Sequence, residues 1–113
     1  MQINDISTHA VAHFGIAPQD ITAFPPSGSQ RRYFRLHFDQ DIAENTRTVI
    51  AAYNENIAEN QLFIAYTQHF LQQGVRVPHI FHVSHNEKLY FQQDLGNTTL
   101  LEQLQSLDKA NYN

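Results

Sequence analysis

Three arginines lie within five positions of one another, at Arg31, Arg32 and Arg35, directly after a turn rich in proline, glycine and serine. The whole chain has only seven basic residues, so this segment holds almost half of them. A guanidinium group can bind a phosphate through two parallel hydrogen bonds, and the cluster therefore raises the hypothesis of an anion-binding segment. Taken singly, each arginine is described more simply as a solvated strand residue whose stem covers aromatic surface. Arg35 alternates with apolar neighbours and is equally suited to pair with an acid.

Three histidines, His79, His82 and His85, are spaced by three residues, a spacing that gathers metal ligands on a helix. Their segment reads instead as a strand and a turn, and on a strand His79 and His82 point to opposite faces. A metal site needs several converging ligands, so we expect none here. The chain also lacks cysteine, which excludes thiolate ligands and disulfides.

Length and composition indicate one domain that spans residues 1–113 and has enough apolar and aromatic side chains for a core. The net charge is −4 and the basic residues form no extended face, which argues against nucleic acid as a partner. There is no signal peptide and no apolar run near the ~20 residues of a membrane span. We therefore expect a cytoplasmic protein without a membrane partner.

Apolar periodicity predicts three helices and five strands. The first helix covers residues 5–14 and stops at Gly15. The long helix covers 54–74, with Asn54 or Asn56 as its cap and Gly74 as its end. A capping box at 99–102 begins a last helix that runs toward Leu107. The predicted strands are 21–24, 33–38, 48–53, 79–84 and 88–93.

This order predicts an α+β fold with a five-stranded antiparallel sheet, one long packed helix, and short helices at both ends. The first three strands form a meander, and 88–93 pairs with 79–84. Within the long helix, Glu59, Phe63, Tyr66 and Phe70 share one face, which we expect to meet the sheet. A carboxylate there needs a partner, because burying it alone is costly. We expect that partner to be Arg31 or Arg32.

The element order, with a Gly/Ser turn between the first two strands, resembles the N-terminal lobe of the protein-kinase-like fold. The segments GSQRRYFRL, VIAAYN, GVRVP and LYFQQDLGNTTLLEQL resemble the aminoglycoside/choline-kinase-like phosphotransferases. Within that group the likeness is greatest to bacterial enzymes of the N-acetylmuramate/N-acetylglucosamine kinase type. It extends from about residue 20 to residue 105.

The resemblance implies that the chain binds ATP with Mg²⁺. In such lobes the first turn closes over the phosphates, aliphatic residues of strands two and three sandwich the adenine, and main-chain groups after strand five meet its edge. It also implies that Arg31 or Arg32 reaches phosphate. The implied nucleotide-site residues are Ser27, Gly28, Ser29, Gln30, Arg31, Arg32, Leu36, Ala51, Glu59, Gln93, Asp94 and Leu95.

Two departures from the family pattern bear on function. The usual lysine of strand three is absent, since the only lysines are Lys88 and Lys109. No segment matches the His-Gly-Asp catalytic loop, so no residue of this chain is assigned as catalytic, and the magnesium ligands are expected in an absent C-terminal lobe. We expect the N-terminal lobe of a kinase that phosphorylates a hydroxyl of a sugar, amino sugar or similar small acceptor. The chain alone is expected not to transfer phosphate.

An alternative from another class stays open: a non-catalytic interaction or self-associating module derived from such a lobe. A lone lobe exposes the apolar surface that normally meets its second lobe. Exposed surface of this kind recruits partners or favours a homo-oligomer.

Overall fold

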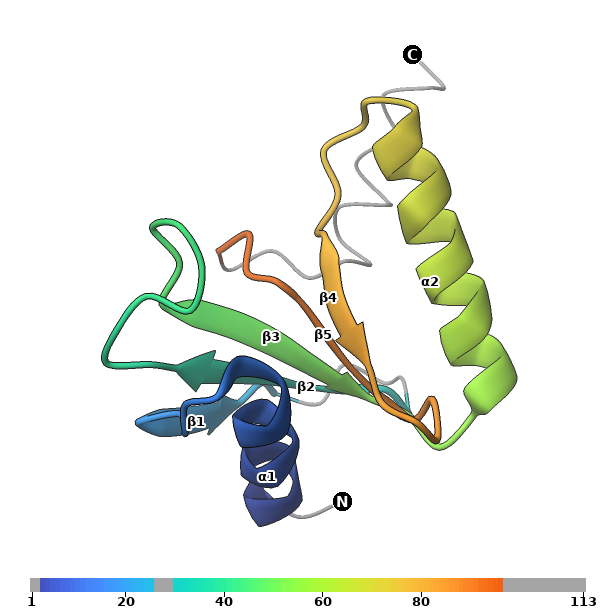
Figure 1. Ribbon diagram of the computed structural model, residues 1–113. Coiled ribbons are helices and arrows are strands. Elements are labelled where there is room, and N and C mark those ends of the chain that lie inside the picture. The colour runs from blue at the N-terminus through green and yellow to red at the C-terminus, as the bar shows by residue number, and fades with distance from the viewer. Residues whose placement is uncertain (1–2, 26–29, 97–113) are drawn as a thin grey trace.

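The computed structural model describes residues 3–25 and 30–96. Within them, two helices and five strands follow one another as the apolar periodicity predicts (Figure 1). Their bounds are α1 (Ile3–Phe14), β1 (Asp20–Ala23), β2 (Arg32–His37), β3 (Thr48–Tyr53), α2 (Ile57–Gln72), β4 (Ile80–Val83) and β5 (Leu89–Gln93). The predicted last helix lies outside the described residues, as do Ser27, Gly28 and Ser29.

The five strands form one antiparallel sheet in the order β1-β2-β3-β5-β4. The meander of the first three strands and the pairing of β4 with β5 are both confirmed. The last hairpin joins the sheet through its second strand, so that β5 lies between β3 and β4. One row across the sheet consists of Thr22, Arg35, Ile50 and Gln92.

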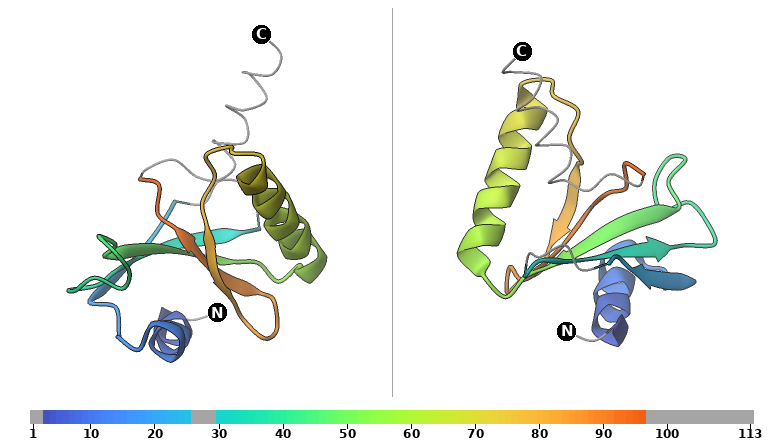
Figure 2. Two further views of the ribbon diagram at one scale, coloured as in Figure 1. Left: turned by 45° about the horizontal axis from the view of Figure 1, so that its top comes forward. Right: turned by 180° about the vertical axis from the view of Figure 1, so that it is seen from behind.

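The helix α1 covers one face of the sheet (Figure 2). Because side chains alternate along a strand, Phe34 and Leu36 of β2 point to this face, while Arg35 points to the other. Phe14, at the end of α1, packs its ring against those of Phe38 and Phe91, with centroids 5.6 Å and 5.5 Å away. The contacts make this face the apolar core of the protein.

The helix α2 lies on the opposite side of the sheet, against β4 (Figures 1 and 2). Asn56 caps its first turn by accepting a hydrogen bond from the Glu59 N–H at 3.0 Å. At the other end Gly74 adopts the left-handed φ of +78°, which stops the helix as predicted.

The predicted inward face of α2 is wrong in one respect. Tyr66 is 53% exposed, and the buried residues of the helix are Asn60 and Thr67. Phe63 and Phe70 are half-buried beside them. Ile64 and Leu71 are half-buried on the other side, so the inward side is centred on Asn60 and Thr67, and Asn60 makes hydrogen bonds there. No helix among the described residues is long and apolar enough to cross a membrane.

Candidate functional site

Arg31 follows the β1–β2 turn, and its side chain lies beneath α2 with an exposed fraction of 3%. Its Nη2 donates a hydrogen bond to Asn60 Oδ1 at 3.0 Å, and its Nη1 lies 3.8 Å from Glu59 Oε1. The guanidinium carbon also lies 3.8 Å from the ring centroid of Phe63. The predicted pairing of Glu59 with an arginine is therefore confirmed, and the arginine is Arg31.

Asn60 connects four parts of the chain. While its Oδ1 accepts from Arg31, its Nδ2 donates to the carbonyl oxygens of Asn54 at 3.0 Å and Glu87 at 2.9 Å. The amide thus ties the end of β3 and the β4–β5 turn to α2 and to Arg31. Sequence reasoning missed this residue, because helical periodicity places it beside the predicted inward face rather than at its centre.

Two tyrosines of the same sheet face lie near Arg31. Burial raises the pKa of the Tyr33 phenol, while the neighbouring Arg31 opposes that rise. Burial raises the pKa of Tyr90 further, and its side chain is fully buried. Neither the Tyr90 hydroxyl nor Oε1 of the buried Gln92 has a hydrogen-bond partner in the described part of the chain. This face of the sheet therefore buries polar atoms that the α1 face does not contain.

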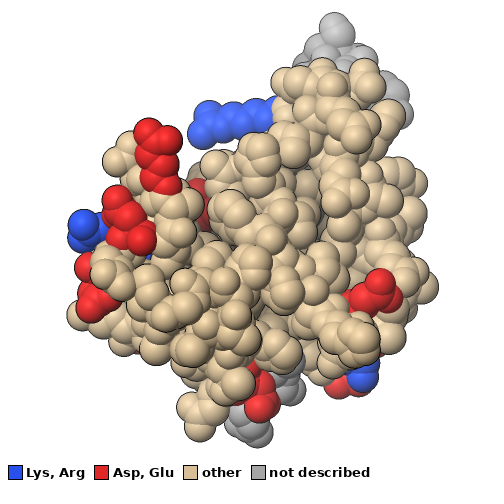
Figure 3. Space-filling model, in the orientation of Figure 1, with Lys and Arg blue, Asp and Glu red and all other residues tan. Residues whose placement is uncertain are grey.

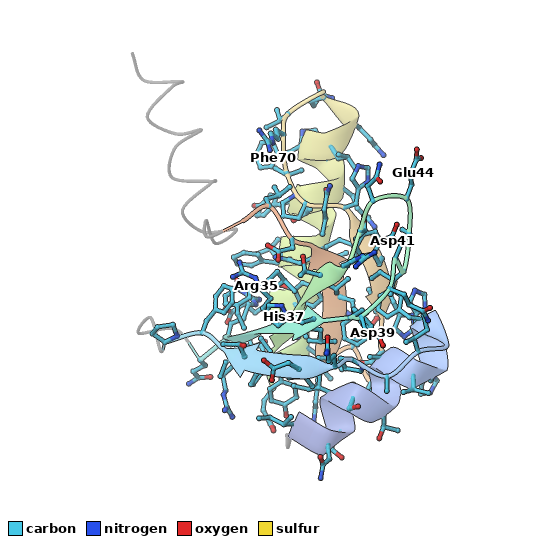
Figure 4. The ribbon with its side chains drawn as sticks, turned by 90° about the vertical axis from the view of Figure 1, so that its left-hand side faces the viewer. Arg35, His37, Asp39, Asp41, Glu44 and Phe70 are labelled. Atoms are coloured by element: carbon cyan, nitrogen blue, oxygen red, sulfur yellow. The ribbon has the colours of Figure 1, made fainter. Side chains whose placement is uncertain are left out.

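Arg35 forms a second polar contact on this face, where Figure 4 shows it on the side of the sheet opposite α1. Its Nε donates to Asp94 Oδ2 at 2.8 Å and its Nη2 to Asp94 Oδ1 at 3.2 Å. It also donates to the Gly96 carbonyl oxygen and lies 5.0 Å over the ring of Phe24. The acidic partner considered for Arg35 is thus Asp94, and the contact fixes the segment after β5 to the middle of β2.

A cavity of about 260 Å³ opens beside Arg35, at the end of β1. Four consecutive residues line it together with the arginine: Thr22, Ala23, Phe24 and Pro25. The lining combines an aromatic ring, small apolar groups and one cation. Such a mixture is typical of small-molecule sites, in which apolar walls surround a few polar groups.

The structure divides the predicted nucleotide-site residues between the two faces of the sheet. Leu36 and Ala51 are packed beneath α1 with no exposed surface, away from Arg31 and Arg35. Arg32 is exposed and lies opposite Tyr53, with its guanidinium 5.3 Å from the Phe34 ring. Strand alternation explains the division, since residues an odd number of positions apart face opposite ways.

The remaining predicted residues do not line the cavity, although Asp94 contacts Arg35, which does. Gln30 is exposed at the start of β2, and Leu95 is half-buried after β5. The Gln93 N–H donates to the His79 carbonyl oxygen at 2.8 Å, so part of its main chain is already engaged by β4. Asp94 contributes its side chain to Arg35 rather than leaving it open to a ligand.

Acidic residues also lie along the β2–β3 loop, where Figure 4 labels Asp39, Asp41 and Glu44. Asp41 Oδ1 accepts a hydrogen bond from Arg47 Nε at 2.8 Å, and both side chains are largely exposed. No group of three or more His, Cys, Asp or Glu in residues 3–25 and 30–96 is arranged to hold a metal ion.

Comparison of the chain with protein-family models and with curated proteins found no match. Function is therefore inferred from the residues and their geometry. The α2 face has a buried arginine, Arg31, and a segment after β5 that is held by Arg35, and Arg35 also lines the cavity at the end of β1.

Proposed function

We propose that this chain is the nucleotide-binding lobe of a small-molecule kinase. It binds ATP with Mg²⁺, and in the whole enzyme the γ-phosphate passes to a hydroxyl of a sugar, amino sugar or similar acceptor. The single observation that carries the proposal is the buried contact of Arg31 with Glu59 and Asn60. In protein-kinase-like lobes a lysine of strand three pairs with a helix glutamate, and strand β3 has no lysine.

In this proposal Arg31 is a positioning residue and does not touch phosphate. Its side chain is almost wholly buried and is engaged by Asn60, Glu59 and the Phe63 ring. It joins the residue directly before β2 to α2. Phosphate oxygens are then bound by backbone N–H groups of the turn, which suit anions.

The base of the nucleotide is assigned to the cavity beside Arg35. Its volume of about 260 Å³ is below the usual 300–1,000 Å³ of whole drug-sized sites and suits a base rather than a complete nucleotide. Phe24 offers a ring for stacking, and the contact of Arg35 with Asp94 brings the segment after β5 to the same place. Leu36 and Ala51 are excluded from this role by their place beneath α1, and Ile50 and Ala52 are the β3 residues on the α2 face.

The test is an NMR titration of the 113-residue chain with magnesium and ATP. We expect shifts concentrated at residues 22–25, at Arg35 and at residues 94–96. Substituting Arg35→Gln should weaken binding at least tenfold, about 1.4 kcal/mol, because it releases the segment after β5 from β2. Arg47→Gln is the matched control, since this exposed arginine pairs with Asp41 in the β2–β3 loop and belongs to no proposed contact, and it should leave binding unchanged.

Circular dichroism of both variants checks that the fold is retained. The absence of shifts at millimolar ATP would overturn the proposal for this lobe. Shifts confined to the α1 face would likewise contradict the assigned site. A coupled assay for ADP release tests the further expectation that the chain alone binds nucleotide without transferring phosphate.

A further inference from the structure

The outer surface of α2 carries a stripe that does not belong to the nucleotide site. Leu62 is 52% exposed, and the adjacent Tyr66 projects from the same side. The stripe is exposed throughout and consists of Ala58, Leu62, Ala65, His69 and Gln72. These residues repeat at alternating intervals of four and three, the spacing through which two helices pack side by side. Asn60 and Thr67 face the opposite way, into the protein.

Between its two ends, α2 itself contributes no Asp, Glu, Lys or Arg beside the stripe. The sequence contains no Asp, Glu, Lys or Arg between Glu59 and Arg76, which covers nearly all of α2. Figure 3 shows the corresponding surface of α2, at the right, as mostly uncharged. An exposed helix ordinarily has a polar face with charged residues, whereas the centres of protein interfaces are depleted of charge. The outer face of α2 therefore has the character of a contact surface.

The charges at the two ends of the helix indicate which partner fits. Three carboxylates lie at the N-terminal end, those of Glu55, Glu59 and Glu87. Two of them have cations of their own chain nearby, since Glu55 lies 3.9 Å from Lys88 Nζ and Glu59 lies 3.8 Å from Arg31 Nη1, so this end keeps an excess of negative charge. The exposed Arg76 follows the C-terminal end. If two copies pack α2 against α2 in opposite directions, Glu55 of each copy lies near Arg76 of the other. A parallel arrangement instead brings like charges together. The antiparallel arrangement also opposes the helix dipoles favourably.

We propose that a second copy of this chain binds along the outer face of α2, antiparallel, with the two-fold axis near Ala65 and Tyr66. The same surface is then used by both copies, as in other two-fold dimers. The helix has 16 residues and is about 24 Å long, so the contact is smaller than a standard interface. The dimer is therefore weak and depends on concentration. It is independent of nucleotide binding, because the stripe faces away from Arg31 and Asn60.

Sedimentation velocity of the 113-residue chain over a hundredfold range of concentration tests the proposal. We expect the sedimentation coefficient to rise from a monomer toward a dimer. Leu62→Glu should raise the dissociation constant at least tenfold, because it places two carboxylates at the contact. Val11→Glu is the matched control: Val11 is 42% exposed on α1, and its replacement should change the constant less than twofold.

Charge exchange tests the direction of packing. Arg76→Glu and Glu55→Arg should each weaken the dimer several-fold, and the double variant should restore it. A wild-type monomer at all concentrations would overturn the proposal, as would equal loss in the Leu62 and Val11 variants. Failure of the double variant to restore the dimer would overturn the antiparallel arrangement. Circular dichroism confirms that each variant is folded.

Discussion

The two faces of the sheet bury different kinds of atoms, although the same strands supply both. Beneath α1 the core is mainly apolar and includes Phe34, Leu36 and Phe91, with the half-buried His82 at its β4 side. On the α2 face Arg31 and Asn60 are buried together. Apolar burial stabilises a fold in proportion to area, whereas burying polar groups costs free energy unless each is hydrogen-bonded. The comparison indicates that the α1 face supplies stability, while the α2 face fixes the positions of particular groups.

The largest loss of stability is expected from a substitution on the α1 face of the sheet. Phe91→Ala removes a fully buried ring that packs against Phe14, and the cavity left behind should lower the free energy of unfolding by about 3–5 kcal/mol. Urea unfolding followed by circular dichroism measures this change. A loss below about 1 kcal/mol would mean that α1 does not pack firmly on the sheet.

A smaller but still substantial loss is expected from Asn60→Leu on the polar side. The variant leaves the Arg31 guanidinium and two carbonyl groups without their amide partner, which should cost about 2–3 kcal/mol. Thr67→Val is the control, because within residues 3–25 and 30–96 the Thr67 hydroxyl donates only to the Phe63 carbonyl of its own helix. If both variants unfold at the same urea concentration, the network around Asn60 is not what holds α2.

Stability should also depend on pH through the histidines between α1 and β4. His82 stacks on His13 with ring centroids 4.4 Å apart, and burial, followed by the positive charges of His13 and His9, lowers the pKa of His82. The unfolded chain therefore binds a proton first, near pH 6.5, so stability is full above that pH and declines as pH falls through the folded-state pKa. Urea unfolding at about pH 5 and about pH 7.5 measures the decline, and His82→Phe should reduce it. An equal decline in the stability of this variant would mean that other titratable groups cause the pH dependence.

The smallest effect is expected from Tyr90→Phe. The Tyr90 hydroxyl is buried without a hydrogen-bond partner among the described residues, so its removal should change the free energy of unfolding by less than about 1 kcal/mol, toward greater stability. The same urea experiment decides the sign. A clear loss of stability would reveal a hydrogen bond at this hydroxyl. The two faces of the sheet would then differ less in how they bury polar atoms.

The sequence predicts the helices and strands well, but it predicts poorly which layer covers each of their faces. All five strands lie within one residue of their predicted bounds, because segments such as YFRLHF alternate without interruption. Periodicity shows which residues share a face, but not which layer will cover it, so Leu36 and Ala51 were assigned to the nucleotide and lie beneath α1. The position of β5 between β3 and β4 was likewise not predicted, since strand order depends on pairing between distant segments.

The contacts of the candidate site were likewise predicted only in part. The ion pair of Glu59 with an arginine was predicted from the cost of burying a carboxylate, but the Glu59 side chain is 42% exposed and the buried partner is Arg31. The acidic partner of Arg35 was one of two alternatives. Asn60 was missed, and Tyr66 was wrongly placed inside. Both errors arise because the predicted face follows Phe63, Tyr66 and Phe70 and omits Ile64 and Leu71. These two residues are half-buried as well, and with them the inward side of α2 is centred on Asn60 and Thr67.

The outer strands of the sheet have a consequence for how concentrated solutions of the protein behave. Both β1 and β4 have only four residues, β1 ends just before Pro25, and the pairing of β4 shifts register between Ile80 and His82. Edge strands that are short or irregular, or that are followed by proline, are poor templates for the repeated strand addition that produces fibrils. At high concentration we therefore expect the protein to form discrete assemblies through side-chain contacts rather than amyloid-like fibrils.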